Sequence, residues 1–146
     1  MTHGLDSSFL VAVEVVEHPH HSTARQTLEQ IVGGGEQVAI APQVLAEFMH
    51  VVTDHRRFVQ PLAMKDARAL AGRWWAAREV DHVFPTDAAA QLFVTWIEQF
   101  KLGRKRLLDT LLAATYHAAG VKTVLTLNPS DFTVFGVFDF VGIRDG

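Results

Sequence analysis

The sequence predicts an α/β fold in which helices surround a central, mainly parallel sheet. Short apolar, β-branched segments alternate along the chain with longer segments whose apolar residues recur at helical spacing. This alternation is typical of parallel sheets, because two parallel strands need a long crossover connection that is usually a helix. The chain has 146 residues, of which 49% are hydrophobic and 20% are charged, so we expect one domain over residues 1–146.

The first half of the chain is expected to hold two strands and three helices. The Gly33-Gly34-Gly35 run ends the second helix, which Ser22 is placed to cap. Pro42 suits the first turn of the third helix, where the N–H that proline lacks has no partner within the helix. The expected ranges are a strand at 3–6, helices at 8–16 and 22–31, a strand at 37–41, and a helix from 42 toward 55.

The second half continues the alternation. Thr86 is a favourable N-cap with Asp87 in the first turn, and Gly120 ends the most apolar helix. The expected ranges are helices at 64–80, 86–102 and 107–119, a brief strand at 82–84, and strands at 122–127 and 134–141. In such a layered fold the working site lies at the carboxyl ends of the strands.

Four acidic residues, each in its own short apolar segment, are the most informative feature of the sequence. Asp6 ends the first expected strand, and Glu47 lies beside the apolar face of the third helix. Asp109 begins the most apolar helix, and Asp131 follows a late strand. A buried charge without a partner is costly, whereas carboxylates that a fold brings together are the ligands that Mg²⁺ and Mn²⁺ require. The sequence therefore predicts a metal-dependent enzyme.

Each of these acids also has an ordinary explanation. Asp6 and Asp109 lie where helices begin, so either acid could simply stabilise a first turn. Glu47 could pair with a distant basic residue, and Asp131 belongs to an Asn-Pro-Ser-Asp turn signature. The occurrence of all four in this order favours a shared site. The apolar face beside Glu47 is expected to consist of Leu45, Phe48, Met49 and Val52.

The segments around the four acids resemble those of one family. These segments are LDSSFLVA, VLAEFMHVVT and LLDTLLAATYHAAGVKTVLTLNPSDF, and the likeness covers nearly the whole chain. They are similar to the PIN-domain ribonucleases, and most of all to the VapC-type toxins of bacterial toxin–antitoxin pairs. The resemblance implies a three-layer fold of helices around a mainly parallel sheet and Mg²⁺- or Mn²⁺-dependent hydrolysis of RNA phosphodiester bonds. It also implies a small antitoxin as partner and a homodimer.

The same resemblance implies roles for individual residues. Asp6, Glu47 and Asp109 correspond to the family's metal ligands. The family places an acid or an asparagine after the late strand, where this chain has both Asn128 and Asp131. We favour Asp131 as the fourth catalytic acid because of its charge, with Asn128 as a neutral orienting group.

Hydroxyl and basic side chains complete the expected site. The resemblance implies that Ser7 or Ser8 holds a metal-bound water or a carboxylate. The net charge of −3 requires that any contact with RNA phosphates be local. Two basic patches are candidates for that contact, Arg56-Arg57 and the run Arg104, Lys105 and Arg106. The second lies just ahead of Asp109 and is our candidate for steering the RNA backbone, although such a run is also typical of solvated surface.

The remaining features predict no second function. The chain has no cysteine, which excludes disulfides and fits a cytoplasmic protein, and its apolar runs are too short for a membrane span. The loop with His18, His20 and His21 is expected to be solvated rather than a zinc site. Trp74 and Trp75 cannot both face one side of a helix, so we expect one in the core and the other in a dimer or partner interface.

Two other functions stay open beside the nuclease. One is an RNA-binding or interaction module on the same fold that has lost its active site. The presence of all four acids argues against this function. A phosphatase with Asp6 as nucleophile usually needs a second acid two residues on, where this chain has Ser8. Toxicity and RNA processing would use the same site, so the role, the target RNA and the number of metal ions stay open at this point.

Overall fold

A computed structural model describes residues 1–141 and has a five-stranded sheet at its centre. The strand order is β3-β2-β1-β4-β5, and all the pairings between neighbouring strands are parallel. The strands are β1 (Thr2–Leu5), β2 (Gln37–Ile40), β3 (Val80–His82), β4 (Thr123–Leu125) and β5 (Asp139–Phe140). The predicted α/β fold with a parallel sheet is therefore confirmed.

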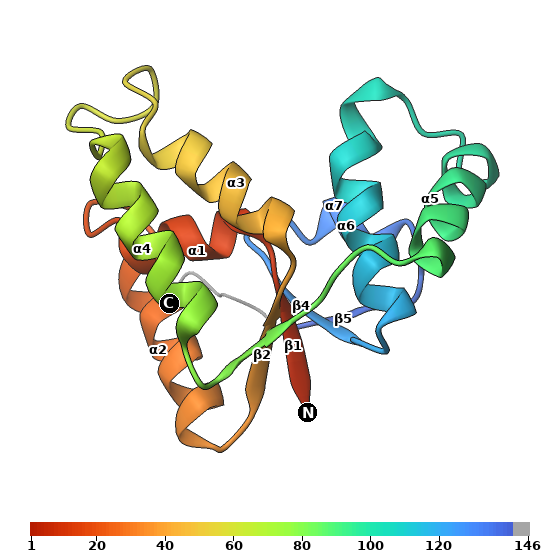
Figure 1. The fold of residues 1–146 in the computed structure, drawn as a ribbon, viewed down its shortest axis with the longest axis horizontal. Coiled ribbons are helices and arrows are strands. Elements are labelled where there is room, and N and C mark those ends of the chain that lie inside the picture. Colours follow the sequence, from red (N-terminus) through yellow and green to blue (C-terminus); the bar gives the residue numbers. More distant parts are fainter. Residues whose placement is uncertain (142–146) are drawn as a thin grey trace.

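Helices cover both faces of the sheet and make three layers (Figure 1). One face carries α1 (Ser7–Glu14), α2 (His21–Gly33), α3 (Pro42–Val52) and α4 (Met64–Ala76). The other face carries α5 (Asp87–Gln99), the short 3₁₀ helix η1 (Arg104–Arg106) and α6 (Leu107–Ala118), and α7 (Ser130–Thr133) follows β4. None of the described helices has both the length and the apolar character needed to cross a membrane.

The direction of winding reverses between β1 and β4. The chain first moves outward from β1 through β2 to β3, and then returns across the sheet to place β4 on the other side of β1. Right-handed crossovers in opposite directions put their helices on opposite faces, which leaves a crevice at the carboxyl ends of the two central strands. Asp6 follows β1 directly, and residues 126–131 follow β4, so both segments lie at this crevice.

A single aromatic side chain fixes α6 against the sheet. Tyr116 of α6 is completely buried, and its hydroxyl donates to the Leu5 carbonyl at 2.5 Å, with the Ala39 carbonyl also within 3.1 Å. The ring lies on Gly4 of β1, where an added Cβ would come within 2.8 Å of two ring carbons. Glycine at this position is therefore what allows α6, which carries Asp109, to approach β1 so closely.

Some of the expected element bounds are wrong. Helix α2 begins at His21 with His20 as N-cap and no side-chain capping bond, so Ser22 does not cap it. Helix α4 ends at Ala76 rather than at residue 80, because Val80 pairs with Val38 of β2 and this sheet pairing outweighs the local helical preference. Thr86 does cap α5, since its side chain accepts a hydrogen bond from the Ala89 backbone N–H.

The last expected strand, at 134–141, is reduced to β5, which spans only Asp139–Phe140. Pro129 has a helical φ of −59° and precedes the single turn of α7. Gly136 then adopts a φ of +68°, which an extended strand cannot contain. Both residues redirect the chain before it can pair with β4.

We predict that Gly4→Ala destabilises the fold by about 1–3 kcal/mol, the usual cost of overpacking a core. The Tyr116 ring cannot yield, because it is buried and its hydroxyl is bound to β1. The free energy of unfolding from urea denaturation measures the effect. Gly103→Ala is the matched control, since an added Cβ there meets nothing within 4 Å and its φ of −93° suits alanine. Equal stability of the two variants would contradict the tight approach.

Candidate active site

Asp6 is fixed at the end of β1 by three hydrogen bonds. Its Oδ1 accepts from the Ser7 backbone N–H at 2.8 Å, so Asp6 is the N-cap of α1. The ordinary explanation for Asp6, that it stabilises the start of a helix, is therefore also true. Its Oδ2 accepts from the Ser8 hydroxyl at 2.9 Å and from the Thr126 hydroxyl at 2.8 Å. Only 6% of the residue is exposed. Burial raises the pKa of Asp6, and the charge of Asp131 adds to this rise. The three hydrogen bonds favour the charged form and offset the rise only in part.

Thr126 is a site residue that the sequence analysis missed. It lies immediately after β4, and its hydroxyl donates to Asp6 while accepting from the Asn128 backbone N–H at 3.0 Å. Ser8 makes a parallel link, because its hydroxyl also accepts from the Leu127 backbone N–H at 3.1 Å. The sequence signal for Thr126 is weak, since a threonine after apolar β-branched residues reads as one more strand residue.

Glu47 lies on α3, but it is exposed rather than close to the buried side of the helix. The fully buried face consists of Val44, Phe48 and Val52, whereas Leu45 and Met49 are only half-buried. Partial loss of hydration raises the pKa of Glu47, and the nearby charge of Asp6 adds to this. The Ser7 side chain and the Arg57 guanidinium lower the same pKa. Glu47 therefore stands at an exposed edge of the site and still senses its charges.

Asp109 projects from the first turn of α6, on the opposite side of the sheet from Glu47. Its pKa is raised to about 6, first by burial and then by the charges of Asp131, Asp6 and Glu47, in that order. Arg106 opposes the shift, with its Nε 4.0 Å from Asp109 Oδ2. The carboxylates thus form one electrostatically coupled group, although they come from separate elements.

Asp131 and Asn128 follow β4 at the same edge of the sheet. Asp131 lies in the first turn of α7, and its backbone carbonyl accepts a hydrogen bond from the Arg106 guanidinium. Asn128 is exposed, and its backbone N–H is bound to Thr126. The turn signature of the sequence is real, since the Asp131 backbone N–H bonds the Asn128 carbonyl at 3.0 Å.

One cleft of about 690 Å³ unites the predicted catalytic residues. All four acids line it, together with Ser7, Ser8 and Asn128. The structure also adds residues that sequence reasoning did not assign to a site. These are Val11, His18, His20, Val51, Phe58 and Leu127. Of the candidate patch Arg56-Arg57, only Arg57 is part of the described lining.

The basic run at 104–106 is not part of the lining. Arg104 and Lys105 are exposed on η1, and Arg106 is half-buried between Asp109 and the Asp131 carbonyl. Arg106 therefore supports the wall of the cleft, and none of the three residues faces its interior.

The histidine loop was expected to be solvated, and it is only partly so, because His18, His20 and His21 are all half-buried. His18 and His20 are half-buried and line the cleft. His18 Nδ1 accepts from the His20 backbone N–H at 3.0 Å, while the His21 ring bonds the Ala12 carbonyl at 2.9 Å. Burial lowers the pKa of His18, and the neighbouring histidines lower it further.

The donor set fits a hard divalent cation by its chemistry. Among residues 1–141, no three His, Asp or Glu side chains are close enough together to hold an ion directly. Mg²⁺ retains several of its waters and needs only one or two protein carboxylates, so this spacing suits it. The mutual repulsion that raises the pKa of Asp109 is what a bound cation would relieve.

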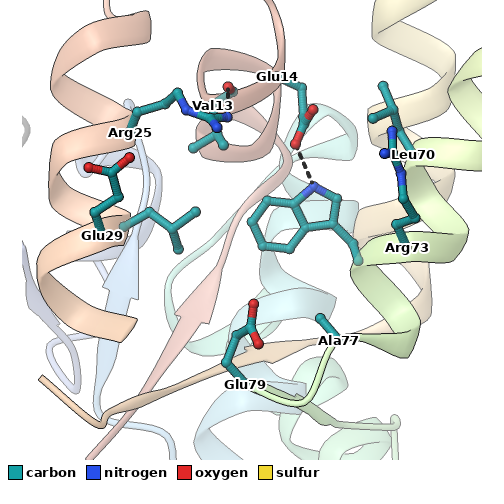
Figure 2. A pocket seen from close by; sticks show the side chains of 10 residues that line it. Val13, Glu14, Arg25, Glu29, Leu70, Arg73, Ala77 and Glu79 are labelled. Atoms are coloured by element: carbon teal, nitrogen blue, oxygen red, sulfur yellow. Dashed lines mark hydrogen bonds between the residues drawn. The ribbon is translucent and has the colours of Figure 1, made fainter. Parts of the chain in front are cut away.

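A second hollow, of about 370 Å³, lies between α1, α2 and α4 (Figure 2). Trp74 is one of the residues that line it, and its Nε1 donates to a Glu14 carboxylate oxygen at 3.1 Å. None of the predicted catalytic residues lines this hollow. Trp75 instead stacks on His82 with ring centroids 3.5 Å apart. Both tryptophans are half-buried, so the expectation that one of them lies in the core is wrong, whereas the partial exposure expected of the other is observed.

The sequence of this chain matches a known family. The PIN domain profile matches residues 5–134, so the chain belongs to the PIN domain family, as the sequence resemblance predicted. Comparison with curated proteins finds no match.

Solved structures of toxin–antitoxin proteins share the fold. VapC20 of Mycobacterium tuberculosis, a sarcin–ricin-loop-cleaving toxin, superposes with a TM-score of 0.72 at 18% identity over 94% of this chain and 96% of that one. VapBC2 of Rickettsia felis, bound to a promoter DNA fragment, superposes with a TM-score of 0.65 at 18% identity over 97% of this chain and 98% of that one. FitAcB of Neisseria gonorrhoeae superposes with a TM-score of 0.65 at 15% identity over 98% of each chain. At such identities the likeness is one of fold.

We predict that Asp109→Asn stabilises the metal-free protein at neutral pH. Because the pKa of Asp109 is raised from 3.8 to about 6, the folded state binds its proton more tightly than the unfolded chain does. Stability therefore falls as the pH rises through this interval, and the charge remains unfavourable above it. With allowance for solvent screening, the gain should be about 1–2 kcal/mol at pH 7.5 and should vanish near pH 3.5.

Denaturation in EDTA at both pH values measures this difference. Asp66→Asn, which removes an exposed acid in the first turn of α4, is the control and should show no such gain. An equal effect of Asp109→Asn at both pH values would show that the charge of Asp109 is not the cause.

Proposed function

We propose that this protein is a Mg²⁺- or Mn²⁺-dependent endoribonuclease and the toxin of a toxin–antitoxin pair. The observation that carries the proposal is the coupled set of four acids, which face one cleft at the switch point of a PIN fold. Carboxylates arranged in this way suit a cation-assisted attack on phosphorus. The fold shared with VapC20, a sarcin–ricin-loop-cleaving toxin, supports RNA as the substrate.

Each side chain has a distinct task in this proposal. Asp6 is held in one orientation by Ser8 and Thr126, and Glu47 and Asp109 reach the same cleft from opposite faces of the sheet. With Asp131 these acids would surround the cation, with one or two of them binding it directly and the others reaching it through its waters. When bound, the cation lowers the pKa of a coordinated water and offsets the negative charge that develops at phosphorus. Attack by water would leave a 3′-hydroxyl and a 5′-phosphate.

The same proposal includes protein partners. The similar structures from Rickettsia felis and Klebsiella pneumoniae are toxin–antitoxin assemblies, which supports a small antitoxin as the partner of this chain. We propose a homodimer as well, because large apolar side chains remain exposed on this protomer. Examples are Phe84, Val94 and Leu108, with 54%, 67% and 71% of their surface exposed.

Cleavage of a mixed set of structured RNAs tests the nuclease proposal. With Mg²⁺ or Mn²⁺ the protein should cut, and EDTA should stop it. Asp6→Asn and Asp109→Asn should lower the rate by more than about 100-fold, since even residues around metal ligands contribute 10–100-fold. Asp66→Asn should cut like the unaltered protein, because Asp66 is outside the cleft. RNA binding without any cleavage would favour an interaction module on the same fold.

We further predict that Thr126→Val lowers cleavage about 10–100-fold while the protein stays folded. Valine has nearly the same shape as threonine, but it cannot donate to Asp6, and a carboxylate that is no longer held in one orientation binds a cation less firmly. Thr126→Ser retains the hydroxyl and should restore most of the rate. Activities are compared over a range of Mg²⁺ concentrations from limiting to saturating, with circular dichroism as the check on folding. If both variants lose the same amount of activity, the hydroxyl of Thr126 is not the cause of the loss.

A further inference from the structure

The cleft carries one permanent positive charge that the catalytic proposal does not use. Arg57 lies in the loop between α3 and α4 and is the one Arg or Lys among the described residues that line the cleft. Its charge lowers the pKa of Glu47, so the guanidinium acts on the site itself. The neighbouring Arg56 is not part of the lining, and 79% of its side chain is exposed.

Asp54 restrains the Arg57 side chain through an ion pair. Its Oδ2 lies 3.5 Å from Arg57 Nε, and its Oδ1 accepts from the Arg56 backbone N–H at 2.9 Å. The Arg56 backbone bond and the two guanidinium groups hold the pKa of Asp54 below its usual range, so it stays an anion. An ion pair made through Nε restricts the arm of Arg57, while its terminal nitrogens can still make the forked hydrogen bonds that phosphate accepts.

An acidic cleft needs such a cation if its substrate is a polyanion. The protein has a net charge of −3, and four carboxylates line the cleft, so an RNA strand is repelled unless a local positive charge receives it. The cations favoured by the sequence do not line the cleft, since Arg104 and Lys105 are exposed on η1 and Arg106 is held against Asp109 and the Asp131 carbonyl. Arg57 is 59% exposed in its side chain and is therefore accessible to a strand that enters the cleft.

We propose that Arg57 binds a backbone phosphate of the RNA strand and that Asp54 positions it for this contact. The inference rests on the proposed nuclease function and adds to it a substrate-binding residue. A phosphate contact carries no base preference, so Arg57 should contribute equally to RNAs of different sequence.

Steady-state cleavage of a fluorescent single-stranded RNA tests the assignment. Arg57→Ala should raise KM by about tenfold or more with a smaller change in kcat, because a charge-assisted hydrogen bond to the substrate is lost. The slope of log KM against log salt should become shallower by about 0.7, as for one phosphate contact to a single strand. Arg57→Lys should retain part of the effect, because it keeps the charge without the fork.

Two further variants separate the roles of the loop. Arg56→Ala is the matched control, and its KM and salt slope should equal those of the unaltered protein. Asp54→Asn should raise KM less than Arg57→Ala does, with an unchanged salt slope, because the phosphate contact remains but is less well oriented. If Arg57→Ala behaves like Arg56→Ala in both KM and salt slope, the phosphate assignment is wrong.

Binding measurements distinguish this inference from the nuclease proposal. Fluorescence anisotropy with the same RNA is recorded for the unaltered protein and for Arg57→Ala and Arg56→Ala in EDTA. Binding that weakens only in Arg57→Ala, in a protein that cleaves no RNA, would support Arg57 and overturn the nuclease function. Cleavage without any effect of Arg57 would overturn the present inference alone. If the unaltered protein neither binds nor cleaves the RNA, both the nuclease proposal and the assignment of Arg57 are wrong.

Discussion

The candidate site depends on the hydrogen bonds that the buried carboxylate of Asp6 accepts. Ser8 belongs to the helix after β1, and Thr126 follows β4, so the two hydroxyls join both strand ends at the switch point through one carboxylate. A buried anion without these donors would be too costly to keep charged. The same hydroxyls accept from the backbone of Leu127 and Asn128, so the network also shapes the loop that leads to Asp131.

The other acids are placed relative to Asp6 by packing on the two faces of the sheet. Tyr116 rests on Gly4 and bonds the Leu5 carbonyl, which sets the distance of α6, and hence of Asp109, from the end of β1. On the opposite face, the buried side of α3 turns Glu47 outward to the edge of the cleft. The electrostatic coupling among the carboxylates is therefore a result of core packing as much as of their own chemistry.

The sequence was sufficient to predict the parallel sheet and the four acids, because both depend on local patterns. It could not predict Thr126, whose hydroxyl acts across 120 residues and whose residue type fits an ordinary strand. Nor could it choose Arg57 over Arg56, since adjacent residues in a loop differ only in the direction that tertiary contacts give them. The run at 104–106 has the more conspicuous charge, yet η1 places it outside the cleft.

The long sequence separation within the Asp6 network also affects when a newly made chain can act. A ribosome that has released the first half of the protein has made Asp6 and Glu47, but it has not yet made Asp109, Thr126 or Asp131. The growing chain consequently contains no complete site, and β4 must join β1 before one exists. An enzyme directed against RNA would thus stay harmless to the ribosome that synthesises it until β4 and the acid that follows it have been made.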